Sequence, residues 1–323
     1  MKKLVALILV LALTFSLTSA LAVTVLTMGT GGTSGTYYAF GSEIATLWNK
    51  NIEGIEVAAQ PTDASKFNIV AVTDGDFQIG WSQNDTISYA YNADPVHFGG
   101  EKFDGFYALA ALYPEAVQIG VAADSDIKDV ADLKGKKVSV GAPGSGTAIN
   151  AEQVLEIGGM TMEGDDFQRY DQNFGDSSDS FQNMQLDAFF ITAGVPNTGI
   201  ISADLKRPVR LLSLTEEQSA ALKEKYPFYI DVTVPAGTYN GVTEDTVIPA
   251  ITATIIVSKD MDEELAYNLT KVLFEKKGDI THAKAQELDP QFAVNGIPCP
   301  IHPGAARYYA EIGVEIPEVS KLK

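Results

Sequence analysis

The sequence predicts an α/β protein made of two lobes, each with its own strands and helices. Three observations favour this fold class. The chain has 323 residues, enough for about two domains. From residue 23 onward, short β-rich runs alternate with longer helix-like stretches. Two segments, beginning at Val23 and Lys137, also share the order of strand, Gly/Ser/Thr-rich loop and helix.

The first part of the chain alternates strand and helix regularly. Strands are expected at residues 23–28, 55–59 and 77–81, and helices at residues 37–50 and 64–73. A β-α-β-α-β order of this kind predicts parallel strands joined by right-handed crossovers.

The remainder of the chain repeats this alternation. Strands are expected at residues 117–123, 137–140, 188–192, 209–213 and 251–257, and helices at residues 127–133, 147–157, 177–186, 262–277 and 304–312. No linker is rich in Pro, Gly or Ser, so we expect lobes joined by more than one crossing. Lobe I is predicted at residues 23–118 and 248–323 and lobe II at residues 119–247. The strands at 117–123 and 251–257 are the expected hinge crossings.

Residues 1–22 have the pattern of a secretory signal peptide. Lys2 and Lys3 precede an apolar run of about 12 residues, and Ala20 and Ala22 form a small-residue cleavage pattern. A membrane anchor fits less well, because a spanning helix needs about 20 apolar residues. The sequence therefore predicts an exported protein that is soluble outside the cytoplasm.

The net charge, the single cysteine and the spacing of the histidines exclude some classes of partner and site. The formal net charge is −19, and without Lys2 and Lys3 the chain has 21 basic and 42 acidic residues, a net charge of −21. Nucleic acid is therefore not an expected partner, because phosphate binding needs a basic face. Cys299 has no second cysteine to pair with, and the three histidines lack metal-ligand spacing, so no metal is expected.

Two Gly-rich loops are the main candidates for binding chemistry. They span residues 29–36 (GTGGTSGT) and 141–147 (GAPGSGT), and each lies between a strand and a helix. The first N–H groups of a helix lack partners within it and carry partial positive charge. Each loop therefore predicts an anion cradle with added hydroxyl donors. The alternative for either loop is a simple helix cap made by one of its Ser or Thr residues.

Known phosphate and nucleophile motifs fit these loops poorly. The loop at 141–147 has P-loop glycine spacing but no Lys before Thr147. Ser34 stands where a dinucleotide fingerprint has its last Gly, and Pro143 stands where a hydrolase elbow needs Gly. The sequence therefore predicts neither a cofactor nor an enzyme.

Further polar residues follow the ends of two predicted strands. Gln83 and Asn84 offer amide donors to a carboxylate, and Asp85 offers a negative partner for an ammonium group. Thr192 is expected to point a hydroxyl at the cleft, and Phe190 to pack on the stem of a ligand. The alternatives are an N-cap role for Asp85 and core packing for Phe190.

Five motifs in this order resemble a known family. They are residues 31–38 (GGTSGTYY), 83–85 (QND), 141–147 (GAPGSGT), 187–196 (DAFFITAGVP) and 302–309 (HPGAARYY). Over essentially all of the chain after residue 22, the sequence is similar to the TAXI-type solute receptors of tripartite ATP-independent periplasmic (TRAP) transporters. Ser34 is a departure, because many relatives have Gly there, and it puts the transfer of ligand preference in doubt.

The resemblance implies a type II periplasmic-binding-protein clamshell that captures a small carboxylate such as glutamate, glutamine or 2-oxoglutarate. It also implies a periplasmic location and a membrane permease of a TRAP transporter as partner, and we expect a monomer. The ligand contacts that it implies are Thr33, Ser34, Gly35, Thr36, Tyr37, Gln83, Asn84, Asp85, Gly144, Ser145, Gly146, Thr147, Phe190 and Thr192.

Three other functions stay open from the sequence. One is a receptor of an ABC importer for another small anion, such as a sulfonate. Another is a secreted hydrolase that uses Ser145, although no histidine lies near it in the sequence. The third is a ligand-sensing subunit of a membrane kinase.

Overall fold

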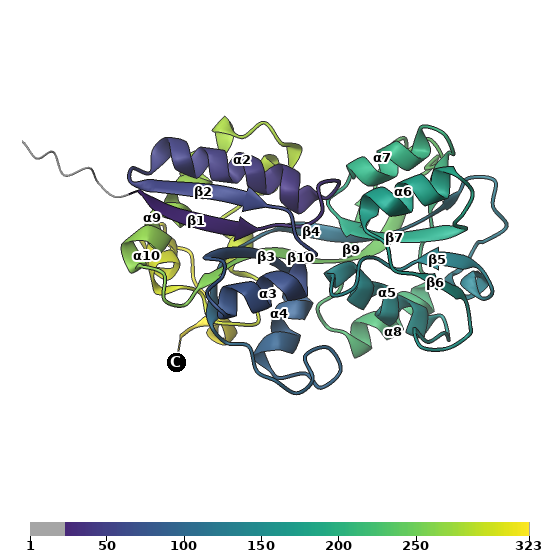
Figure 1. The fold of residues 1–323 in the computed structure, drawn as a ribbon, viewed down its shortest axis with the longest axis horizontal. Helices are drawn as coiled ribbons and strands as arrows, with labels where there is room; N and C mark the ends of the chain where they lie inside the picture. The colour runs from purple at the N-terminus through teal and green to yellow at the C-terminus, as the bar shows by residue number, and fades with distance from the viewer. Residues whose placement is uncertain (1–22, 323) are drawn as a thin grey trace, which may run out of the picture.

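A computed structural model describes residues 23–322, and the predicted signal peptide at residues 1–22 lies outside the described residues. Figure 1 shows two lobes side by side, with a sheet running through both and helices packed around it. Within residues 23–322, no helix combines the length and the hydropathy of a membrane span.

Ten strands in the described part of the chain form one sheet. They are β1 Thr24–Gly29, β2 Ile55–Gln60, β3 Ile79–Gln83, β4 Phe106–Ala122, β5 Lys137–Ser139, β6 Gln168–Tyr170, β7 Ala188–Ala193, β8 Val209–Leu211, β9 Ile230–Val234 and β10 Thr246–Ser258. The order is β2-β1-β3-β10-β4-β7-β5-β6, with β8 beside β4 and β9 beside β10. β1 is parallel to β2 and β3, as the alternation predicts, and β5 is parallel to β6 and β7.

Helices surround the sheet in both lobes (Figure 1). They are α2 Thr36–Asn51, α3 Ser65–Thr73, α4 Asn84–Tyr91, α5 Gly146–Ile157, α6 Phe174–Gln182, α7 Thr198–Asp204, α8 Glu216–Lys225, α9 Glu263–Glu275 and α10 Pro303–Glu311, with short 3₁₀ helices that include η1 Val130–Leu133 and η3 Ala283–Glu287. α2, α3, α4, α9 and α10 lie with β1–β3 in one lobe, and α5–α8 lie in the other (Figure 1).

β4 and β10 are long strands that join the lobes. They pair in antiparallel register from Phe106 opposite Ser258 to Ala116 opposite Ala250. The sequence predicts only the second part of β4, because Pro114 interrupts the apolar pattern and proline cannot donate to a strand ladder. The strand nevertheless continues through Pro114, and the pairing with β10 has two register shifts close by.

The change from one hydrophobic core to the others lies along these two strands, where they pass from one lobe to the other. One core uses residues from Leu26 to Tyr113 and from Ala253 to Val314. Two further cores, on the other lobe, use residues from Ala116 to Ile251. The lobe boundaries at residues 118 and 248 stay predictions, and the change of core lies near both.

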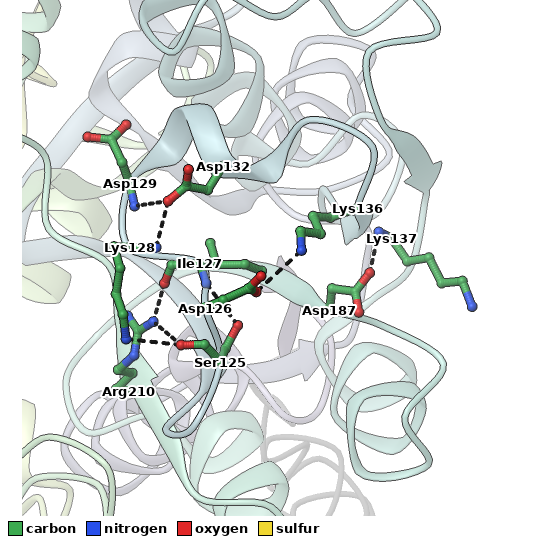
Figure 2. A network of polar contacts seen from close by, with 10 residues as sticks. All are labelled: Ser125, Asp126, Ile127, Lys128, Asp129, Asp132, Lys136, Lys137, Asp187 and Arg210. Atoms are coloured by element: carbon green, nitrogen blue, oxygen red, sulfur yellow. Dashed lines mark hydrogen bonds and ion pairs between the residues drawn. The ribbon is translucent and has the colours of Figure 1, made fainter.

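Two helices begin at other residues than the sequence predicts, because a side chain caps the helix start. Asp132 Oδ2 accepts hydrogen bonds from the backbone N–H groups of Lys128 and Asp129 at 2.8 and 3.0 Å, as Figure 2 shows. Because Asp129 caps η1, the helix expected at 127–133 begins only at Val130. Asn173 likewise caps α6, which starts three residues before the expected position.

Apart from short 3₁₀ helices, five elements lie outside the ranges expected from the sequence: α4, α7, α8, β6 and β9. They are short or mostly polar, so the apolar periodicity that reveals other elements is weak in them. In α8 only Leu222 is buried, and the helix start is stabilised by a capping box between Thr215 and Gln218.

Gly304 allows α10 to pack closely on α9. A methyl group at Gly304 would lie 2.1 Å from the carbonyl oxygen of Glu263 and 2.7 Å from the backbone nitrogen of Tyr267. We therefore expect Gly304→Ala to lower the free energy of unfolding by about 2 kcal/mol or more, because backbone atoms must move apart. Urea denaturation of the purified variant measures this change.

Gly278→Ala is the matched control, since a methyl group there has no heavy atom within 4 Å. Equal denaturation midpoints for the two variants would contradict the close approach of α9 and α10.

Candidate functional site

A cavity of about 290 Å³ lies where the two lobes meet. Its walls come from the loops before four helices, from the ends of β3 and β7 and from the middle of β4. One lobe contributes residues 31–37, 61–65, 83 and 115, and the other contributes residues 142, 145–147, 173–175 and 192–193. Ligands of open α/β sheets bind beyond the carboxyl ends of strands, so this cavity is the candidate site.

Ten of the fourteen contact residues expected from the sequence line this cavity. They are Thr33, Ser34, Gly35, Thr36, Tyr37, Gln83, Ser145, Gly146, Thr147 and Thr192. Tyr37 is the tyrosine that faces the cavity, whereas Tyr38 is absent from the lining.

The other four, Asn84, Asp85, Gly144 and Phe190, lie outside the lining. Phe190 is fully buried in a core of the second lobe. Asn84 Oδ1 accepts from the backbone N–H of Thr252, on β10, at 3.1 Å. Gly144 has φ of 75°, a left-handed backbone that favours glycine at the turn before α5.

Four helices begin at the wall of the cavity. α2, α3, α5 and α6 start at Thr36, Ser65, Gly146 and Phe174, and all four of these residues line the cavity. The caps of α2 and α3 make no side-chain hydrogen bond to the helix. Unpaired N–H groups of the first turns and the positive ends of the helix dipoles therefore favour a negative group here.

Two hydroxyls of the second loop keep their own protons free for a ligand. Ser145 Oγ accepts from the backbone N–H of Ala148 at 3.1 Å, and Thr147 Oγ1 accepts from the backbone N–H of Thr192 at 3.3 Å. A hydroxyl that accepts in this way can still donate. Among the described residues that line the cavity, none is Lys, Arg or His. An anion there would be held by neutral dipoles.

Glu115 is a cavity residue that the sequence reasoning missed. It lies on β4, is 2% exposed, and its Oε2 accepts from the hydroxyl of Tyr37 at 2.5 Å. Burial raises the pKa of Glu115 to about 8; the bond from Tyr37 opposes this rise and the charge of Asp85 adds to it. In the sequence, the indication for Glu115 was its position as a single acidic residue within a mostly apolar stretch.

Asp85 is buried behind the cavity and connects the lobes. It lies in the first turn of α4 but is not its N-cap, which is Gln83. Asp85 Oδ2 accepts from Asn150 Nδ2, on α5, at 3.0 Å, and Asn150 Nδ2 also donates to the hydroxyl of Tyr229 at 3.0 Å. Burial raises the pKa of Asp85 to about 6, although hydrogen bonds from Thr86 oppose the rise.

Hydrogen bonds between the lobes flank the cavity. On one side, Thr198 donates to the carbonyl oxygen of Ser34 at 2.8 Å, and the N–H of Gly194 donates to Thr36 Oγ1 at 3.2 Å. On the other side, besides the Asp85–Asn150 bond, Gln153 donates to the hydroxyl of Tyr89 at 2.9 Å. The lobes are therefore in contact on both sides, in a closed arrangement.

The buried carboxyl of Glu115 predicts a pH-dependent stability. Its folded pKa of about 8 lies above its ordinary value of 4.5, so the folded protein holds a proton that the unfolded chain has released. This contribution to the free energy of unfolding is complete below about pH 4.5 and is lost as the pH rises toward 8. We expect Glu115→Gln to raise the free energy of unfolding at pH 8 by about 2 kcal/mol or more.

Urea titrations between pH 4.5 and 8 measure the effect, with the exposed Glu101→Gln as the matched control. Glu115→Gln and wild type should converge at the acid end. Parallel curves for the two proteins over the whole range would exclude a proton on Glu115.

Several solved structures have a similar fold at low identity. A protein from Bordetella bronchiseptica RB50 aligns with a TM-score of 0.54 and 16% identity, over 92% of this chain and 86% of that one. The alkanesulfonate-binding protein SsuA from Xanthomonas axonopodis pv. citri, bound to MOPS, aligns with a TM-score of 0.47 and 17% identity, over 90% and 84%. An ancestral arginine-binding protein bound to arginine aligns with a TM-score of 0.45 and 20% identity, over 81% and 96%.

The two-lobe α/β architecture confirms the predicted fold class. A sequence model of one family matches residues 28–313, which is most of the chain. On this match, the chain belongs to the NMT1-like family.

Proposed function

We propose that this protein is a periplasmic solute receptor that captures a small carboxylate between its lobes and delivers it to a TRAP permease. The observation that carries the proposal is the cavity between the lobes, where four helices begin and no basic side chain is present among the described lining residues. Backbone N–H groups and hydroxyls can hold a carboxylate reversibly. Such binding suits a receptor that must release its ligand.

The closed arrangement supports a clamshell cycle. Contacts on both sides of the cavity join the lobes, and among the strands of residues 23–322 only β4 and β10 pass from the core of one lobe to the cores of the other. A ligand that touches both lobes favours the closed form over the open form. In the proposed cycle, the closed form presents the surface that the permease recognises.

The TRAP assignment rests on the TAXI-type motifs at residues 31–38 and 302–309. The structure gives the second motif an architectural role. His302 caps α10 by accepting from the N–H of Gly304 at 3.2 Å, and the hydroxyl of Tyr309 donates to the carbonyl oxygen of Leu109 at 2.9 Å. Both contacts lie in the lobe that contains β1–β3, away from the cavity lining.

A receptor for an ABC importer is the second candidate function. Its support is the set of similar solved structures, which includes a protein named as a sulfonate ABC transporter component and one from an amino acid ABC transporter. A cavity of helix N-termini and hydroxyls suits a sulfonate as well as a carboxylate.

A ligand panel distinguishes the two candidates. Protein comprising residues 23–323, refolded to remove bound solute, would be melted with glutamate, glutamine, 2-oxoglutarate, succinate, taurine, methanesulfonate and phosphate. At about 100 times its dissociation constant a ligand adds ~2.7 kcal/mol, which raises the melting midpoint by several degrees. We expect a carboxylate to give the largest shift; a shift with the sulfonates alone would favour the ABC receptor.

Removing one cavity hydroxyl tests the second loop. We expect Thr147→Val to weaken carboxylate binding roughly tenfold or more, since a hydrogen bond to a charged group contributes about 1.5–3 kcal/mol. Isothermal titration calorimetry on the folded variant measures this affinity. Thr46→Val, an exposed position on α2, is the matched control. Unchanged affinity in Thr147→Val would remove the second loop from the proposed site.

A further inference from the structure

We propose that Glu115 is the specificity-determining residue of the cavity. It accepts hydrogen bonds from a primary ammonium group, so the receptor selects an α-amino acid over the corresponding 2-oxo acid. This inference rests on the proposed receptor function, and it places the ammonium partner at Glu115 instead of Asp85. Asp85 lies outside the cavity lining and accepts a hydrogen bond from Asn150, whereas Glu115 is part of the lining.

The lining of the cavity contains two kinds of charged region. Helix starts, with their positive dipole ends, lie on the walls that carry Thr36, Ser65 and Gly146. The acidic residues of the lining are Glu115, which is buried, and Asp63, which is exposed. A ligand with a carboxylate at one end and an ammonium group near Glu115 matches both regions.

The strand register places two other polar residues close to Glu115. In the sheet, Glu115 lies opposite Ile251 on β10, and Gln83 lies opposite Ala253, two residues along the same strand. Thr192 lies opposite Val117, two residues after Glu115 on β4. The strand pairing therefore places Gln83, Glu115 and Thr192 in neighbouring positions of one sheet, and all three line the cavity.

These neighbours provide acceptors that have no partner within the described part of the protein. Gln83 Oε1 and Thr192 Oγ1 are buried without a hydrogen bond. An ammonium group has three N–H donors, which matches these two oxygens and one carboxylate oxygen of Glu115. Buried acceptors left without donors are unfavourable, so a ligand that satisfies all three gains selectivity over one that lacks the donors.

Charged groups around Glu115 leave its carboxyl available. Tyr37, from α2, donates to Oε2 and fixes the orientation of the side chain. Lys284, from η3, has its ammonium 2.6 Å from Glu287 Oε1 and 5.2 Å from the ring centre of Tyr113. It forms its ion pair with Glu287, and its charge lowers the pKa of Glu115 without overcoming the effect of burial. Asp85, from α4, adds negative potential from behind the cavity.

This environment couples ligand binding to the protonation of Glu115. In the closed form, burial raises the pKa of Glu115 to about 8, so without a ligand the carboxyl carries a proton at neutral pH. An ammonium group favours the ionised carboxylate, so amino acid binding releases that proton to solvent. Affinity for the amino acid then increases with pH up to about 8, roughly tenfold per pH unit. A 2-oxo acid has no ammonium group and releases no proton.

Calorimetric titration tests this inference with L-glutamate, L-glutamine, 2-oxoglutarate and succinate. Each ligand is titrated at pH 6.5 and 8, in two buffers of different ionisation enthalpy, so that released protons are counted. For wild type we expect an amino acid to bind tighter than 2-oxoglutarate, with proton release. In Glu115→Gln we expect amino acid affinity at pH 8 to fall about tenfold or more, and proton release and the pH slope to disappear.

Glu101→Gln, an exposed acid, is the matched control and should behave as wild type. Thermal melts show whether Glu115→Gln is folded, and its retained affinity for 2-oxoglutarate gives a second measure. If Glu115→Gln binds amino acids with wild-type affinity and pH slope, or if wild type prefers 2-oxoglutarate, Glu115 is not the selector and the receptor function stands. If wild type binds none of the carboxylates, the receptor proposal fails and this inference with it.

Discussion

The antiparallel pairing of β4 and β10 is the constraint on which the rest of the structure depends. These strands pass from one core to the other, and the sheet on each side is built outward from them. Backbone hydrogen bonds between two strands resist stretching but allow bending and twisting. In the proposed receptor, the pair therefore keeps the lobes at a fixed separation while permitting them to open and close. The cavity lies beside this pair, and Glu115 is part of β4 itself.

Neutral helix dipoles and buried acidic side chains contribute electrostatic potentials of opposite sign at the site. The chain has a net charge of −19, so its overall field does not attract anions. Local helix ends supply the positive potential, and in a cavity shielded from water their effect is larger than at the surface. Glu115 and Asp85 supply negative potential close by, and their raised pKa values reflect the cost of holding charge where solvent is excluded.

Closure and selectivity are linked through these same residues. Asn150 on α5 bonds to Asp85 on α4, and Tyr37 on α2 bonds to Glu115 on the crossing strand. Movement of one lobe would change the burial of both carboxylates, and with it their tendency to ionise. In the proposed receptor, proton binding, ligand choice and lobe closure therefore respond to one another.

The sequence alone determined the features that depend on near neighbours. The two Gly-rich loops, the helices that follow them and the parallel order of β1 to β3 could be predicted, because strand alternation and helix starts are set by residues a few positions apart. Tertiary structure decided the rest. Whether Asp85 or Glu115 faces the cavity depends on how β3, β10 and β4 pair across long sequence separations. No local pattern carries that information, since burial is settled only when the lobes pack together.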